Sequence, residues 1–168
     1  MGAERDADVL GFHVEIEAVV AAVAANAAGL HAAERRGQVA VVLRVDPYHA
    51  GVEIIGLHWL LISPEGLYVN HPDDVIRMRT RDYFRSLVDF CGDLGGEVMI
   101  IGSPKQRNVQ PDWDRQETWD RTRAVFEDCL ELAASRGVYL CIEPLSRDQT
   151  NLLSSAAEAR RLVDEIDH

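Results

Sequence analysis

The sequence has few cysteines and no excess of positive charge, and each shortage argues against a class of protein. Its three cysteines, Cys91, Cys129 and Cys141, are odd in number, widely separated and embedded in apolar patterns. This is typical of small core residues in a reducing cytoplasm, not of a disulfide framework. Lysine and arginine total 17 against 28 aspartates and glutamates, a formal net charge of −11. That balance disfavours a nucleic-acid groove and favours an acidic soluble enzyme or partner-binding protein.

Long hydrophobic runs and a secretory signal are also lacking. The alanine-rich run at residues 18–28 is shorter than a membrane span requires and is flanked by charged residues. The first ten residues contain acids and no basic segment before an apolar one. We therefore expect no membrane partner and no secretion. With 168 residues and 47% hydrophobic content, the chain fits one domain, residues 1–168, with a substantial core.

From residue 52 onward, short apolar runs alternate with longer helical patterns. We predict strands at residues 52–62, 97–102 and 138–142, each followed by a helix. This alternation predicts an α/β fold whose parallel sheet is covered on both faces. Earlier residues are less regular: 12–18 alternate like a strand, 19–36 resemble a helix, and 38–45 could be a strand or part of a helix.

The third predicted strand ends in a carboxylate, Glu143, followed by Pro144. Proline removes the next backbone donor, so the ladder stops and Glu143 lies at the carboxyl edge of the sheet. Ligands bind at that edge in α/β folds. Glu143 is therefore a candidate catalytic or metal-binding residue. The alternatives are that it caps a neighbouring helix or pairs with an arginine such as Arg147.

Polar side chains also follow the other strands, and we expect all of them to face the same mouth. His58 is a candidate metal ligand or sugar contact, or else a satisfied core histidine, and Trp59 is a pocket wall or core residue. The loop from Lys105 to Arg107 either grips an anion such as phosphate or is a solvated loop. The candidate substrate-binding residues are His58, Trp59, Ser103, Gln106, Arg107, Arg147, Gln149 and Asn151.

Three blocks carry a family resemblance: GLHWLL at 56–61, TRDYFRSLVDFCGDLGGEVMIIGSPKQR at 80–107 and IEPLSRDQTN at 142–151. Together they resemble the sugar phosphate isomerase/epimerase family, the xylose isomerase-like TIM barrels, from about residue 50 to 168. Residues 1–50 match that family poorly. The resemblance implies a (β/α)8 barrel of parallel strands alternating with helices, of which this chain would contain a part, roughly four or five of the eight strands.

The resemblance also implies a divalent metal ion (Mn, Mg, Co or Zn) held by Glu, Asp, His and Glu from late strands, the first ligand being Glu143. The other three ligands have no counterpart, because the chain stops near the point where the strand carrying the family's Asp should begin. Gln149 stands where the ketose 3-epimerase branch has a second glutamate. We therefore expect a truncated or split member of the family.

The resulting hypothesis is a metal-dependent isomerase or epimerase of a small sugar or sugar phosphate, impaired in this chain. Glu143 would move a proton next to a carbonyl. The alternative is a catalytically inactive barrel fragment that acts as a dimerising or partner-binding domain. Its partner would be a second copy or a complementing barrel half. An abasic-site endonuclease on the same barrel is disfavoured by the net charge of −11.

Overall fold

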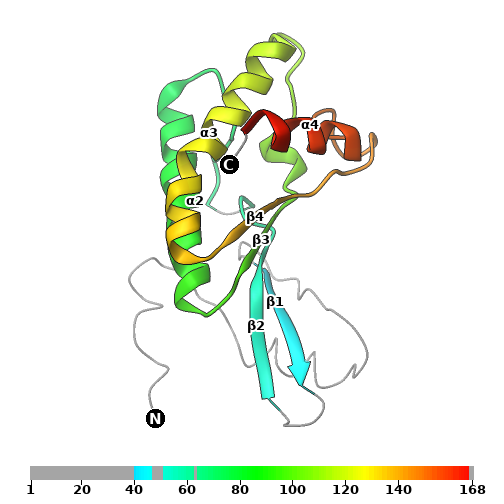
Figure 1. Cartoon of the computed structure of the whole chain (residues 1–168). Helices are drawn as coiled ribbons and strands as arrows, with labels where there is room; N and C mark the ends of the chain where they lie inside the picture. The colour runs from blue at the N-terminus through cyan, green and yellow to red at the C-terminus, as the bar shows by residue number, and fades with distance from the viewer. Residues whose placement is uncertain (1–39, 47–50, 63, 167–168) are drawn as a thin grey trace.

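The structure is a computed structural model that describes residues 40–46, 51–62 and 64–166 (Figure 1). The strand predicted at 12–18 and the helix predicted at 19–36 lie outside these residues. The described elements, in chain order, are β1 (Ala40–Asp46), β2 (Gly51–His58), α2 (Asp74–Asp93), β3 (Val98–Ile101), the 3₁₀ turn η2 (Pro104–Gln106), α3 (Arg115–Arg136), β4 (Tyr139–Ile142) and α4 (Ala156–Ile166).

The four described strands form one sheet in the order β1-β2-β3-β4. β2, β3 and β4 are parallel and alternate with α2 and α3, which confirms the predicted α/β partial barrel. The parallel part contains three strands, because β1 pairs antiparallel with β2. In this pair Asp46 lies opposite Gly51, and strands separated by so few residues pair antiparallel, because a parallel pair needs a crossover of about a dozen or more residues.

β2 is shorter than the strand predicted for residues 52–62. It ends at His58, and Trp59 takes a left-handed backbone conformation with φ 58°. Within β2, a Cβ on Gly56 would lie 1.9 Å from the carbonyl oxygen of Val98 in β3. Only glycine allows the two strands to approach this closely.

α2 and α3 lie side by side along the sheet (Figure 1). Each has an aspartate cap: Asp73 accepts from Val75 N at 2.8 Å, and Asp114 accepts from Glu117 N at 2.8 Å, as the spacing of Asp114 and Glu117 predicts. Gly137 ends α3 with φ 68°. Phe84 and Phe126 bring the two helices together in the core, with ring centroids 5.7 Å apart.

The buried core includes Cys91 and Cys129, as predicted, but not Cys141, which is exposed. The prediction that both faces of the third parallel strand are covered is likewise wrong, since Tyr139 is 70% exposed. Exposure alternates along β4, so the face that carries Tyr139 and Cys141 is not covered by the described residues. In the part of the chain that the structure describes, no helix is long and apolar enough to cross a membrane.

Candidate functional site

Glu143 follows β4 directly, where the predicted strand ends. Its backbone N–H donates to the carbonyl of Ile101 at 3.1 Å, which continues the β3–β4 ladder by one residue. A Cβ on Gly102 would lie 1.8 Å from Oε2 of Glu143. The carboxylate therefore lies over the backbone just past β3, in space that only a glycine leaves open.

The carboxylate of Glu143 also meets His58 at the end of β2. His58 Nε2 and Glu143 Oε2 are 3.3 Å apart. The two side chains are 19% and 37% exposed, so the pair is partly shielded but open to solvent. Glu143 thus contacts a side chain from another strand and not Arg147 on its own loop. The ends of β2 and β4 supply an acid and an imidazole to one point.

A pocket of about 420 Å³ opens at this point, at the carboxyl ends of the three parallel strands. Six of the nine predicted site residues line it: His58, Trp59, Ser103, Gln106, Glu143 and Gln149. Five further residues complete the lining: Ile62, Gly102, Pro104, Lys105 and Leu145. The lining combines one carboxylate, one imidazole, one ammonium and two amides with an aromatic wall.

The turn η2 is fixed in place by hydrogen bonds. Ser103 Oγ accepts from Leu61 N at 3.3 Å, and the carbonyl of Gln106 accepts from Val69 N at 2.9 Å. Ser103 is 8% exposed, whereas Lys105 is exposed. The turn therefore holds Ser103 inward as a structural contact and presents Lys105 and Gln106 at the rim.

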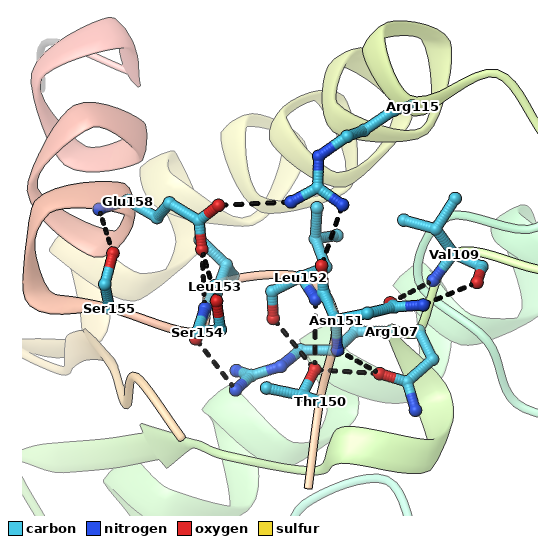
Figure 2. A network of polar contacts seen from close by, with 11 residues as sticks. Arg107, Val109, Arg115, Thr150, Asn151, Leu152, Leu153, Ser154, Ser155 and Glu158 are labelled. Atoms are coloured by element: carbon cyan, nitrogen blue, oxygen red, sulfur yellow. Dashed lines mark hydrogen bonds and ion pairs between the residues drawn. The ribbon is translucent and has the colours of Figure 1, made fainter. Parts of the chain in front are cut away.

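Arg107, predicted to contact substrate, lies behind the pocket instead of in its lining. It is 2% exposed, and its guanidinium donates to the carbonyls of Ile101 at 3.2 Å, Glu143 at 3.0 Å and Leu153 at 3.5 Å. Figure 2 shows it beneath the loop that leads to α4. Burial lowers the pKa of Arg107, and the charges of Glu143 and Glu158 partly offset this. Its Nη1 and Nη2 donate to carbonyls, and it does not line the pocket, so it does not bind an anion there.

Asn151 and Arg147 also lie outside the lining. Asn151 Oδ1 accepts from Val109 N and its Nδ2 donates to Val109 O, each at 2.8 Å, a reciprocal pair that ties two loops together (Figure 2). Arg147 is exposed. Gly102 is one of the lining residues that the sequence analysis did not identify. Its position directly between a strand and the polar loop could have indicated it.

Two non-glycine residues in the described part of the chain have left-handed backbones, one in the pocket lining and one in contact with Arg107. Trp59 has φ 58° and lines the pocket, and Leu153 has φ 57° and accepts from Arg107. Such conformations cost about 1–2 kcal/mol each and persist where surrounding contacts hold them. Both are held beside the ends of β2 and β4.

The family model for xylose isomerase-like TIM barrels matches residues 22–168. The chain belongs to this family. Among curated proteins, no significant match to this barrel chain is found.

Solved structures with the same fold include sugar epimerases. An L-ribulose 3-epimerase has TM-score 0.56 and 22% identity, over 62% of this chain and 35% of that one. A D-psicose 3-epimerase from Clostridium cellulolyticum H10 has TM-score 0.55 and 20% identity, over 62% and 37%. A 3-keto-D-glucoside 4-epimerase from E. coli has TM-score 0.52 and 17% identity, over 60% and 41%. The match thus spans well under half the length of each of these structures.

A metal site of the kind the resemblance implies is not complete within the described residues. No group of three or more His, Cys, Asp or Glu side chains there is placed to hold a metal ion. Glu143 and His58 offer two donors, while zinc takes about four ligands and magnesium about six. The described part of this barrel does not by itself fit a bound metal.

Proposed function

We propose that this chain carries part of the active site of a sugar isomerase or epimerase, with Glu143 as the group that moves the proton. The observation that carries the proposal is the contact between Glu143 and His58 inside a pocket at the carboxyl ends of parallel strands. Catalytic groups of such barrels come from the ends of several strands. Belonging to the family supports the same reaction class.

The chemistry follows from a hydrogen on a carbon next to a carbonyl. In a 2-ketose, the C3–H bond breaks, Glu143 takes the proton, and the electron pair moves into an enediolate. A second acid, supplied from outside the described residues, delivers a proton to the opposite face of C3 and gives the epimer. Glu143 then releases its proton to solvent, and no oxidant or reductant is consumed. A positioned acid or base contributes roughly 10²–10⁴-fold to such a step. His58, adjacent to the carboxylate, is placed to hydrogen-bond a substrate oxygen.

The pocket lining suits a small polyhydroxylated molecule. Gln106 and Gln149 offer amide donors and acceptors, and Trp59 offers an apolar face. Lys105 is the cationic side chain in this lining, so a sugar phosphate would place its phosphate there. The sugars named for the similar structures, L-ribulose and D-psicose, are the first candidates.

We also propose that a divalent cation takes part, with Glu143 as one ligand and the remaining ligands supplied from outside the described residues. The described donors are too few alone. We further propose that residues 1–168 form part of a single barrel domain that works in the reducing cytoplasm, where its three free cysteines stay reduced.

Product analysis tests the proposal. The full chain is incubated with L-ribulose, D-psicose and D-fructose, with and without Mn²⁺, and epimers are separated by chiral chromatography. We expect epimer formation that Glu143→Gln lowers by about 100-fold or more. Unchanged turnover in the variant would contradict the role of Glu143, and stimulation by Mn²⁺ would support the cation.

A second candidate, a partner-binding domain, is favoured by a separate observation. An apolar groove of about 520 Å³ lies between α3, β4 and α4, and it includes Tyr139, 70% exposed, and Val163, 51% exposed. β4 is the outer strand of the described sheet. We propose a second copy of this chain as the occupant, with one of its strands paired with β4 and one of its helices in the groove.

Light scattering on the eluting protein tests this candidate. If the groove receives a second copy, the chain elutes as a dimer, and Val163→Glu returns it to a monomer. An inert dimer that lacks epimerase turnover would favour the second candidate over the first. A stable active monomer would contradict it.

A further inference from the structure

We infer that Arg107 is a positioning residue that fixes Glu143 in its catalytic orientation from behind the sheet. The inference rests on the proposed role of Glu143 and deepens it. Arg107 is not among the residues that line the pocket, so it acts on the reaction through the groups that it holds, and Glu143 is the one of these that lines the pocket.

Arg107 contacts the backbone on both sides of the hydrogen bond that holds Glu143 to β3. Its Nη2 donates to the carbonyl of Glu143 at 3.0 Å. Its Nη1 donates to the carbonyl of Ile101 at 3.2 Å, and that same carbonyl accepts the N–H of Glu143. One guanidinium therefore ties the last hydrogen bond of the β3–β4 ladder to the carbonyl that follows it. The carboxylate extends from this fixed backbone.

Only arginine suits this arrangement. A planar guanidinium presents its donors in a rigid fork, so one side chain reaches carbonyls from β3, from the end of β4 and from Leu153. Lysine has three donors on a flexible arm and cannot hold the same geometry. Burying a cation that bonds to backbone carbonyls is unfavourable unless its donors are satisfied. Its Nε has no partner in the described structure, so burying this arginine carries a free-energy cost.

Arg107 is itself held by buried groups. Its carbonyl accepts from Asn70 Nδ2 at 2.7 Å, and Asn70 Nδ2 also donates to Thr122 Oγ1 on α3 at 3.2 Å. Asn70 and Thr122 are 0% and 1% exposed. A continuous series of contacts therefore runs from α3 through Asn70 and Arg107 to Glu143. Such a series sets the orientation of a site residue without contacting its ligand.

The test compares Arg107→Met and Arg107→Lys with a control, Arg115→Met, in the full chain. Arg115 also contacts the loop before α4: it donates to Asn151 O at 2.8 Å and pairs with Glu158 at 3.1 Å (Figure 2). Its described hydrogen bonds and ion pair do not include Glu143. NMR measures the hydrogen-exchange rate of the Glu143 amide relative to the rates of amides inside β4. The ¹⁵N chemical shift of His58 Nε2 reports whether the neighbouring carboxylate keeps its position.

We expect Arg107→Met to speed exchange at Glu143 by roughly tenfold to a hundredfold relative to the interior of β4, because hydrogen bonds to a charged donor are lost. The His58 signal should shift, and kcat for epimer formation should fall with little change in KM. Arg107→Lys should restore part of each change, and it serves as the test if the methionine variant does not fold. Arg115→Met should leave all three readouts unchanged.

Equal effects from Arg107→Met and Arg115→Met would overturn the inference, because Arg107 would then be a general loop support. So would an unchanged Glu143 amide and His58 shift. The outcome is separate from that of the proposed function. If the wild-type chain forms no epimer, the proposed function fails, while the exchange data still decide whether Arg107 positions Glu143.

Discussion

The pocket and the groove beside β4 have similar size but differ in the functional groups of the side chains that line them. The pocket at the strand ends, about 420 Å³, gathers His58, Lys105 and Glu143 with two amides, and fixed contacts lie behind it. The groove along α3, β4 and α4, about 520 Å³, is lined mainly by aliphatic and aromatic side chains. The difference indicates that the pocket suits a small polar ligand and the groove suits a polypeptide. Substitutions can affect one without the other.

Gly56→Ala has the largest expected effect, because it destabilises the sheet on which both the pocket and the groove depend. In Gly56→Ala the new Cβ meets the Val98 carbonyl, placed 1.9 Å away, and backbone cannot move aside as a side chain can. We expect the free energy of unfolding to fall by about 2–3 kcal/mol or more in chemical denaturation. The control is Gly95→Ala, where φ is 76° and no atom lies within 4 Å of the Cβ. It should cost about 1 kcal/mol. Equal losses would argue against close approach of β2 and β3.

Gly102→Ala, the second substitution, should disturb the pocket and leave the groove unchanged. Gly102→Ala places a methyl group 1.8 Å from Glu143 Oε2, and the carboxylate must swing away from His58. We expect kcat for epimer formation to fall at least tenfold, with stability changed by less than about 1 kcal/mol, since a flexible side-chain end absorbs the clash. The matched control is Gly92→Ala, whose Cβ displaces the surface side chain of Arg136 at 2.9 Å. Turnover should persist there.

The third substitution tests α4, which borders the groove. Glu158 accepts from Ser154 N at 2.6 Å and pairs with Arg115 at 3.1 Å (Figure 2). Burial raises the pKa of Glu158, but these hydrogen bonds and the arginine outweigh it, so the net pKa is lowered. Because the folded pKa lies below the unfolded one, the stabilisation is present above the unfolded pKa and is lost as pH falls through the folded pKa.

Glu158→Gln should therefore reduce the free energy of unfolding by about 1 kcal/mol at pH 7, and the difference from wild type should vanish in acid. The control, Asp164→Asn, removes an exposed i,i+4 pair with Arg160 and should change stability by less than about 0.5 kcal/mol. A difference that persists in acid would show that the carboxylate charge is not responsible.

The smallest expected effect is a difference in reactivity between the buried thiols of α2 and α3 and the exposed thiol of β4. Burial raises the pKa of Cys91 to about 11 and of Cys129 to about 12. Burial also raises the pKa of Cys141, but this residue is exposed on β4. We expect a thiol reagent at pH 8 to label Cys141 alone until denaturant is added, and slowly. Rapid labelling of all three would contradict the core packing. Protection of Cys141 at high protein concentration would indicate that the β4 face is covered.

The sequence predicted the features that depend on local pattern. Strand and helix alternation, the Asp114 cap and the Gly137 stop each follow from a few neighbouring residues. The meeting of His58 with Glu143 also follows, because parallel strand ends share one edge of a sheet.

Other features depend on contacts between distant segments. Arg107 stands in a polar loop and its pattern indicates an exposed residue, yet the loop before α4, some forty positions later, covers it. Cys141 fits a strand covered on both faces, but the face of β4 that carries Tyr139 and Cys141 is exposed in the described structure. Which segments cover a strand face or a loop residue depends on distant parts of the chain, so the adjacent residues do not predict either outcome.

The most direct measurement is solvent exchange at the substrate carbon. A ketose incubated with the full chain in D₂O should acquire deuterium at C3, and NMR measures the rate of this exchange. Glu143→Gln should lower the exchange rate by about 100-fold or more. Exchange that proceeds equally with the glutamine variant, or no exchange above buffer with the wild-type chain, would contradict Glu143 as the proton-transferring group.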